Sequence, residues 1–143
     1  MKQDFSRSWR SSVQPRKQHK FVSNAPLHIK HIFLSANLSK DLRKKYGKRN
    51  LPLRKGDEVL VMRGSSRKKK AKVVSINLKR CIVALEGLQR TKKDGSKVNI
   101  FFHPSSLQVQ SLNLDDKHRL AALNRKGNAA AKSEPKLETK EKK

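Results

Sequence analysis

Apolar residues recur at two different spacings along this 143-residue chain, and each spacing predicts a different structure. The first is a spacing of four residues, which runs through Leu34, Leu38, Leu42 and Tyr46. It places one apolar stripe on one face of a helix that begins at Ser35 or Ser39 and ends at Tyr46. Gly47 supplies the C-terminal stop, because glycine readily takes the left-handed conformation in which many helices end.

The second spacing is one of two residues, in which apolar and polar positions alternate as they do in short strands. It replaces the helical pattern between residues 51 and 110. Apolar and β-branched runs bounded by turn residues predict five strands, at 57–63, 71–77, 81–86, 98–102 and 107–110. Between the third and fourth of these, Lys92 and Lys93 precede Asp94-Gly95, a dipeptide typical of tight hairpins. This series of short strands predicts a mainly β fold built around a small barrel.

The two ends of the chain lack the apolar residues for a core of their own. Residues 1–26 mix Ser, Gln, Arg and Lys without any period, so we expect an extended arm that is disordered alone. Residues 112–126 predict a helix that starts at Asp115 or Asp116, and a Lys- and Glu-rich tail follows it. The expected organisation is a basic arm with a short helix (1–50), a barrel (51–112), and a helix with a disordered tail (113–143).

Composition adds a strong positive charge to this picture. The chain has 36 Lys and Arg against 11 Asp and Glu, a formal net charge of +25, and every part of it carries an excess of basic residues. Such a charge repels itself, so a polyanion that supplies negative charge favours the compact state. Only 34% of the residues are hydrophobic, which leaves one small core and argues against an ordinary soluble enzyme. Nucleic acid is the leading partner.

Membrane binding, organelle import and solubility fit the basic character less well. Binding to an anionic membrane requires basic residues interleaved with Trp, Phe and Leu on one helical face, but Trp9 lies among Ser and Arg. The Arg- and Ser-rich start could also be a mitochondrial transit peptide, although the basic character continues past a plausible cleavage point. Solubility surfaces usually mix both signs of charge. We find neither a long apolar run nor a signal-peptide stretch, and we expect a protein that stays inside the cell.

The densest candidate site is the segment 56–74, in which a strand runs into a polar turn and a second strand leaves it. Gly64 stands where the first strand ends, and a glycine there permits a positive φ or the close approach of a phosphate. Ser65 and Ser66 offer hydrogen bonds. Six basic residues accompany them: Arg63, Arg67, Lys68, Lys69, Lys70 and Lys72. The turn is therefore expected to project positive charge from a rigid platform.

This segment resembles a KOW motif, and the sequence around it resembles the family of large-subunit ribosomal protein twenty-four, called twenty-six in eukaryotes. The resemblance is to the archaeal and eukaryotic branch and covers roughly residues 15–126. It is carried by Pro15-Arg16-Lys17-Gln18, Asn24-Ala25-Pro26-Leu27-His28, Leu38-Ser39-Lys40-Asp41-Leu42-Arg43, Lys45-Tyr46-Gly47, Leu53-Arg54-Lys55-Gly56-Asp57, Val61-Met62-Arg63-Gly64 and His103-Pro104-Ser105. A KOW motif alone is shared with transcription elongation factors, whereas the extended series is specific.

The resemblance implies an SH3-like barrel that binds ribosomal RNA near the 5′ end of the large-subunit RNA, close to the polypeptide exit tunnel. It also implies a part in early subunit assembly. The family usually has Gly where this chain has Lys68 and Ala71, so the loop here is more charged and less permissive. The residues themselves support contacts dominated by phosphates, and recognition of folded RNA shape, because aromatic side chains are few.

We expect the RNA contacts to come from four basic groups. The N-terminal arm, which would become ordered only on RNA, contributes Arg7, Arg10, Arg16, Lys17, Lys20 and Lys30. The end of the first helix contributes Arg43, Lys44, Lys45, Lys48 and Arg49. The KOW turn contributes Gly64, Ser65 and Ser66 with its six basic residues, and the hairpin contributes Lys92 and Lys93.

Catalytic and metal-binding interpretations of the remaining polar residues are weaker than structural ones. His28 and His31 could share a metal on a helix, but no third ligand is near, so we favour RNA contact or a plain surface role. Asp57 and Glu58 point to opposite faces of a strand, which excludes an acid/base pair, and we expect them at the edge of the barrel. Cys81 opens a strand, and we expect a small buried hydrophobe rather than a nucleophile.

Two questions stay open at the level of the sequence. Phe101 and Phe102 could stack on bases, although a strand interior plus an edge is the commoner fate of such a pair. The function we expect is that of a structural component of the large ribosomal subunit in the cytoplasm, or in the nucleolus during assembly in a eukaryote. Its partners would be ribosomal RNA and neighbouring ribosomal proteins, without catalysis, cofactor, metal, membrane or small-molecule substrate. The alternative is a KOW-type transcription elongation factor or a free RNA chaperone.

Overall fold

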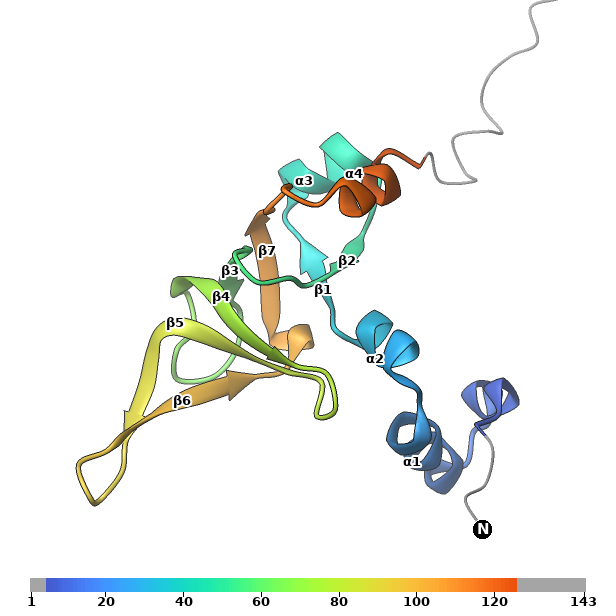
Figure 1. The fold of residues 1–143 in the computed structure, drawn as a ribbon, viewed down its shortest axis with the longest axis horizontal. Helices are drawn as coiled ribbons and strands as arrows, with labels where there is room; N and C mark the ends of the chain where they lie inside the picture. Colours follow the sequence, from blue (N-terminus) through green and yellow to red (C-terminus); the bar gives the residue numbers. More distant parts are fainter. Residues whose placement is uncertain (1–4, 126–143) are drawn as a thin grey trace, which may run out of the picture.

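Short strands dominate residues 5–125, the part of the chain that the structure, a computed structural model, describes (Figure 1). The strands are β1 (Ser35–Leu38), β2 (Asn50–Pro52), β3 (Glu58–Val61), β4 (Lys70–Asn77), β5 (Ile82–Thr91), β6 (Lys97–Phe102) and β7 (Leu107–Ser111). The helices are α1 (Pro15–Asn24), α2 (Leu27–Phe33), α3 (Lys40–Tyr46) and α4 (Lys117–Asn124), with 3-10 turns η1 (Arg7–Ser11) and η2 (Pro104–Ser106). The mainly β fold with short flanking helices is confirmed.

The strands form one curved sheet in the order β2-β1-β7-β3-β4-β5-β6. Neighbouring strands are antiparallel, except that β1 runs parallel to β7. Strand β4 pairs with β3 on one side and β5 on the other, and the sheet bends along it into a barrel-like shape. The barrel is not closed, because β2 and β6 lie at the two free edges of the sheet.

The core is built from alternating residues of the central strands. Val59 and Val61 on β3, with Leu107 and Val109 on β7, are fully buried, while the residues between them are partly exposed. This is the period of two that the sequence predicted for these segments. All five strands predicted from the sequence are present, and Cys81, at 8% exposed, belongs to the core beside β5.

Helix α3 covers only the later part of the longest span predicted for the first helix. The residues predicted for the first turn of that span, Ser35–Leu38, form strand β1. Leu34 and Leu38 are fully buried, and Ala36 between them is 1% exposed, so these residues share one face of an extended segment. A spacing of four fits both a helix and the alternation of a strand, which is why the leucines alone left the start open. Helix α3 begins after Ser39, whose hydroxyl accepts a hydrogen bond from the backbone N–H of Leu42 at 3.3 Å. Gly47, with φ +62°, ends it as predicted.

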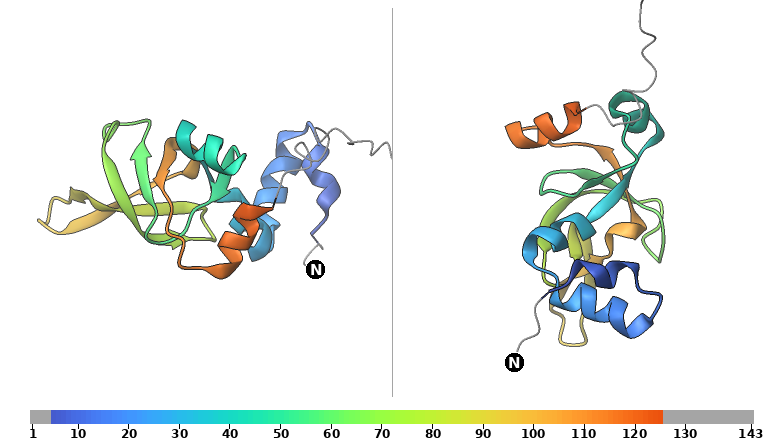
Figure 2. Two further views of the ribbon diagram at one scale, coloured as in Figure 1. Left: turned by 90° about the horizontal axis from the view of Figure 1, so that it is seen from above. Right: turned by 90° about the vertical axis from the view of Figure 1, so that its right-hand side faces the viewer.

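The expectation of an extended N-terminal arm was wrong, because residues 7–33 form η1, α1 and α2 (Figure 2). Three phenylalanines from different segments make a small cluster: the ring centroids of Phe5 and Phe21 are 5.2 Å apart, and those of Phe21 and Phe33 are 5.7 Å apart. Phe21 is only 7% exposed. The side-chain amide of Gln18 donates to backbone carbonyls of η1 and the following turn, which fixes α1 against η1.

Asp57 is fully buried, which corrects its expected place at the edge of the barrel. The Arg119 side chain on α4, at 4% exposed, donates from Nη1 to Asp57 Oδ1 at 2.6 Å and from Nη2 to Oδ2 at 2.7 Å. The same carboxylate accepts backbone hydrogen bonds from Arg54 at 2.8 Å and Asn113 at 3.0 Å. Burial of this ion pair is tolerated because the charges are paired and the carboxylate oxygens have hydrogen-bond donors. It ties α4 to the sheet.

The turn before β3 explains why glycine precedes Asp57. Gly56 has φ +85°, and the backbone N–H of Asp57 donates to the carbonyl of Arg54 at 3.3 Å. A Cβ atom at Gly56 would lie 2.9 Å from Nδ2 of Asn113, closer than side-chain atoms approach. The positive φ therefore favours glycine, and a larger residue would also force the Asn113 side chain to shift. The Lys55-Gly56-Asp57 sequence is the connection that aims Asp57 inward.

Candidate nucleic-acid interface

The loop between β3 and β4, residues 62–69, is closed by backbone hydrogen bonds. The N–H of Val61 donates to the carbonyl of Lys69 at 2.9 Å, and the N–H of Lys68 donates to the carbonyl of Val61 at 2.8 Å. Gly64 has the positive φ that the sequence suggested, +90°, and its carbonyl accepts a hydrogen bond from Arg67 at 3.1 Å. These bonds hold the tip of the loop in one conformation on the end of two paired strands.

The basic side chains of this loop are exposed, and its two serines differ. Arg63, Arg67, Lys68, Lys69, Lys70 and Lys72 are all exposed, as is Ser65. Ser66 is only 7% exposed and so presents less surface to a partner than Ser65 does. Lys68 has φ +69°, a left-handed conformation that disfavours a side chain. This is one of the two positions at which the resembling family usually has glycine.

The hairpin between β5 and β6 presents a second basic group. Lys92 and Lys93 are exposed at its tip, as are Arg90 and Lys97 on the adjoining strand ends, which the sequence alone did not single out. The turn is closed by the Lys92 N–H, which donates to the carbonyl of Ser96 at 2.9 Å. Hydrogen bonds from the hydroxyl and backbone N–H of Ser96 lower the pKa of Asp94, so this carboxylate stays ionised and shapes the turn.

The basic group at the end of α3 is divided between two roles. Lys44, Lys45 and Arg49 are exposed. Arg43 donates from Nε to the carbonyl of Leu38 at 2.9 Å and also bonds the side chain of Asn37, while Lys48 bonds the carbonyl of Ala122 on α4. Arg43 and Lys48 therefore hold α3 and α4 in place and offer less to a ligand than their neighbours.

The N-terminal helices carry a fourth basic group. Arg7, Arg10, Arg16, Lys17 and Lys20 are exposed, and the Lys20 ammonium lies 5.4 Å from the centre of the Trp9 ring. Lys30 is partly buried and its Nζ reaches the carbonyls of Ser23 at 3.3 Å and Lys79 at 3.4 Å. Lys30 thus joins the N-terminal helices to the β4–β5 turn.

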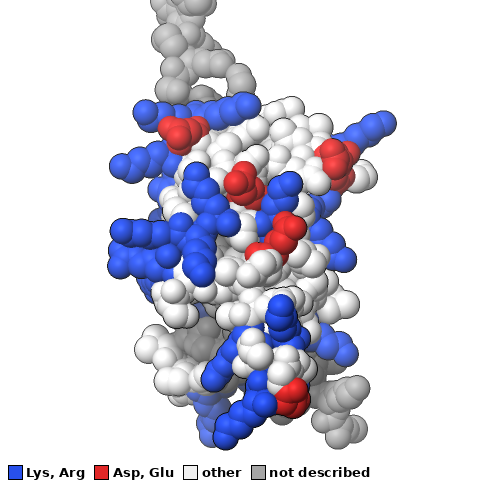
Figure 3. Space-filling view, turned by 90° about the vertical axis from the view of Figure 1, so that its left-hand side faces the viewer, with Lys and Arg blue, Asp and Glu red and all other residues white. Residues whose placement is uncertain are grey.

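Acidic side chains do little to neutralise these groups. Asp57 is paired with Arg119, and Asp116 is paired with Arg54. Figure 3 shows the face that carries the β3–β4 loop and the β5–β6 hairpin, where Lys and Arg cover more of the surface than the Asp and Glu side chains that lie among them. Local potential on this face is therefore positive, and a polyanion is the complementary ligand.

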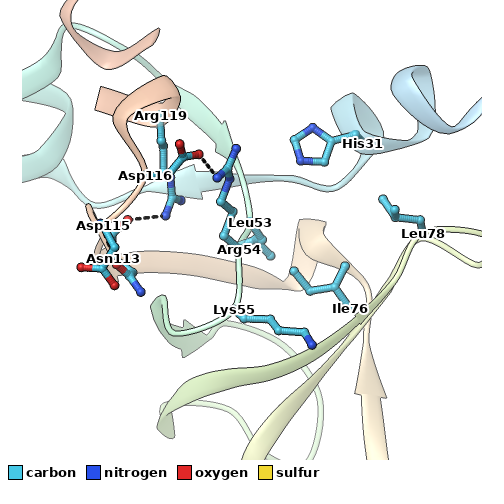
Figure 4. A pocket seen from close by; sticks show the side chains of 10 residues that line it. All are labelled: His31, Leu53, Arg54, Lys55, Ile76, Leu78, Asn113, Asp115, Asp116 and Arg119. Atoms are coloured by element: carbon cyan, nitrogen blue, oxygen red, sulfur yellow. Dashed lines mark hydrogen bonds and ion pairs between the residues drawn. The ribbon is translucent and has the colours of Figure 1, made fainter. Parts of the chain in front are cut away.

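One cavity lies beside the Asp57–Arg119 ion pair. The cavity in Figure 4, of about 370 Å³, has Arg54, Asn113, Asp116 and Arg119 on one side and the apolar Ile76 and Leu78 on the other. Three of its charged side chains are already paired, Arg54 with Asp116 and Arg119 with Asp57. Within residues 5–125, no three His, Cys, Asp or Glu side chains lie together as a candidate metal site, and His28 and His31 belong to no such group. In the same range no helix is long and apolar enough to cross a membrane.

The fold and this surface define a small, strongly basic β domain with short helices at its ends. A family model that describes the ribosomal proteins called L26 in eukaryotes and L24 in archaea matches residues 12–126. The chain belongs to this ribosomal protein family.

Three archaeal relatives, each named large ribosomal subunit protein uL24, support that assignment. The protein of Korarchaeum cryptofilum is 43% identical over 116 residues, which cover 81% of this chain and 88% of the relative. That of Methanothrix thermoacetophila is 44% identical over 108 residues, covering 76% of this chain and 93% of the relative. That of Methanosphaera stadtmanae is 44% identical over 115 residues, covering 80% of this chain and 98% of the relative.

Proposed function

We propose that this protein is a structural, non-enzymatic component of the large ribosomal subunit that binds ribosomal RNA through phosphate contacts. The observation that carries the proposal is the β3–β4 loop, where exposed Lys and Arg side chains stand on a loop closed by its own hydrogen bonds. Each lysine or arginine that neutralises a phosphate releases counterions from the RNA, which is the main source of affinity. Membership of this ribosomal protein family supports the large ribosomal subunit as the particle in which this binding takes place.

The finer parts of the proposal concern place and timing. The protein binds near the 5′ end of the large-subunit RNA, close to the exit tunnel, beside other ribosomal proteins, and it joins early in assembly. The N-terminal helices and the β5–β6 hairpin extend the contact, since their basic residues are exposed on the same molecule. The protein is cytoplasmic, and nucleolar during assembly if its source is a eukaryote.

Sedimentation separates this proposal from the alternative of a KOW-type transcription elongation factor or a free RNA chaperone. Lysate is run on a sucrose gradient after a high-salt wash, and the protein is detected in each fraction. We expect it to stay on the large subunit, because many phosphate contacts act together. Release to the top of the gradient, or migration with RNA polymerase, would contradict the ribosomal function.

Charge removal tests whether the β3–β4 loop binds the RNA. In a variant with Arg67, Lys68, Lys69 and Lys70 changed to Ala, we expect weaker binding to large-subunit RNA. The slope of log K against log salt should fall in magnitude by about 3, at about 0.7–0.9 for each phosphate that is no longer neutralised. A matched variant removes four other exposed charges, Lys40, Lys79, Arg80 and Lys117. If both variants change the slope equally, the loop has no special role.

A further inference from the structure

The two adjacent phenylalanines of β6 have different surroundings. Phe102 packs against the hydrophobic core. Phe101 is 52% exposed, although it is one of the few aromatic residues of the chain. Successive side chains of a strand point to opposite faces, so Phe101 lies on the outer face of the sheet. Packing in the core therefore does not explain why the sequence has an aromatic residue at this position.

The residues across the sheet from Phe101 are small or apolar. Its partner across β5 is Ala84, which is 1% exposed, and the partner of Ala84 on β4 is Ser75. A bulge precedes Ser75, so Val74 has no Cα partner on β5 and is 49% exposed. Phe101 and Val74 thus lie about two strand spacings apart, on the order of 10 Å, with a small residue between them. A spot of this size is too small for a typical protein interface.

Charged side chains surround the apolar spot along the strands. Lys97 lies four residues before Phe101 on the same face of β6, and Lys72 lies two residues before Val74 on β4. Asn99, between Lys97 and Phe101, accepts a side-chain hydrogen bond from Gln89 at 3.0 Å. One carboxylate, that of Glu86, is exposed on β5 in the same region. The aromatic ring of Phe101 thus has one lysine on its own strand, β6, and another on β4, on the other side of β5.

We propose that Phe101, supported by Val74, is a stacking platform for one unpaired nucleobase of the bound RNA. Proteins that bind single-stranded segments stack bases on aromatic side chains of a sheet and hold the adjoining phosphates with basic residues. The flanking lysines suit the phosphates of such a nucleotide, and they disfavour a basic protein partner. The inference rests on the proposed RNA-binding function and adds a base contact to the phosphate contacts.

The test compares a polyanion that has bases with one that has none. The probes are single-stranded poly(A) and inorganic polyphosphate, titrated against wild type, Phe101→Ala and Val98→Ala. Val98 lies on the opposite face of the same strand and is 37% exposed, which makes it the matched control. Removal of one stacked base costs about 1–3 kcal/mol, so Phe101→Ala should weaken poly(A) binding about 5- to 150-fold. Polyphosphate affinity and both salt slopes should stay unchanged, since the substitution removes no charge.

A fluorescence measurement makes the stacking visible. The variant Phe101→Trp in a Trp9→Phe background has a single Trp on the platform. We expect poly(A) to quench its emission and polyphosphate to leave it unaltered. Circular dichroism before each titration shows whether every variant is folded.

One outcome overturns the platform and leaves the RNA-binding function intact: Phe101→Ala binds poly(A) as tightly as wild type does. If that variant is in addition released from the salt-washed large subunit, Phe101 contacts another protein. If wild type binds neither poly(A) nor large-subunit RNA, the proposed function itself fails.

Discussion

Lys68 places a basic side chain in the β3–β4 loop at a residue whose backbone conformation is unfavourable for any side chain. Its φ of +69° is one of two positive values among the non-glycine residues of the described chain. A side chain in this region costs about 1–2 kcal/mol, which glycine avoids. The loop nevertheless keeps a lysine at this point, next to Lys69 and Lys70. The sequence indicated this position as a departure from the family's glycine, but only the backbone shows that Lys68 takes the left-handed conformation.

Replacing Lys68 by Gly should therefore stabilise the fold while weakening RNA binding. Relief of the strained conformation exceeds the greater entropy of glycine in the unfolded chain, and we expect a net gain of about 0.5–1 kcal/mol in the free energy of unfolding. Urea unfolding measures it. Lys69→Gly is the control, because it removes the same charge at a residue without positive φ and should be destabilising. Equal effects of the two variants would show that strain at Lys68 is unimportant.

At the scale of elements, the sequence predicted what depends on local pattern and missed what depends on distant partners. Strands β3 to β7, the hairpin at Gly95 and the stop at Gly47 each follow from a short run of residues. The N-terminal helices do not, because their apolar contacts join Phe5, Phe21 and Phe33 from separate segments. The pairing of Asp57 with Arg119 spans 62 residues, and neither residue has a local pattern that marks it as buried.

Helix α4 should depend on that ion pair for its docking. The helix has eight residues, and besides Arg119 only Leu123 is buried. Asp57→Ala leaves the Arg119 guanidinium buried without its counter-charge, and we expect the free energy of unfolding to fall by about 3–5 kcal/mol. Unfolding in urea, followed by far-UV circular dichroism, measures this decrease.

The double variant Asp57→Ala, Arg119→Met separates the pair energy from the burial cost. It should recover part of the stability, since no unpaired charge remains in the interior. Arg54→Met is the matched control. It breaks the more exposed pair with Asp116, whose side chains are 42% and 27% exposed, and should cost less than about 1 kcal/mol. A decrease as small for Asp57→Ala would contradict the role of the pair in holding α4.

For the molecule as a whole, the charge that we propose to bind RNA opposes folding in the absence of RNA. A net charge of +25 on 143 residues with one small core gives repulsion that the described ion pairs relieve only at Asp57 and Asp116. Basic groups on the β3–β4 loop, on the hairpin and on the N-terminal helices lie on different elements, so a wrapped polyanion can neutralise them together. Binding and stability are therefore linked.

This linkage predicts opposite effects of salt on the free and bound protein. Raising salt from about 50 mM to about 200 mM shortens the screening length and should raise the Tm of the free protein, because repulsion weakens. With large-subunit RNA present near its Kd, the same change should lower the Tm toward that of the free protein, because salt weakens binding to the phosphates. Differential scanning fluorimetry with and without RNA measures both. A Tm that falls with salt in both samples would show that self-repulsion is a minor force in this fold.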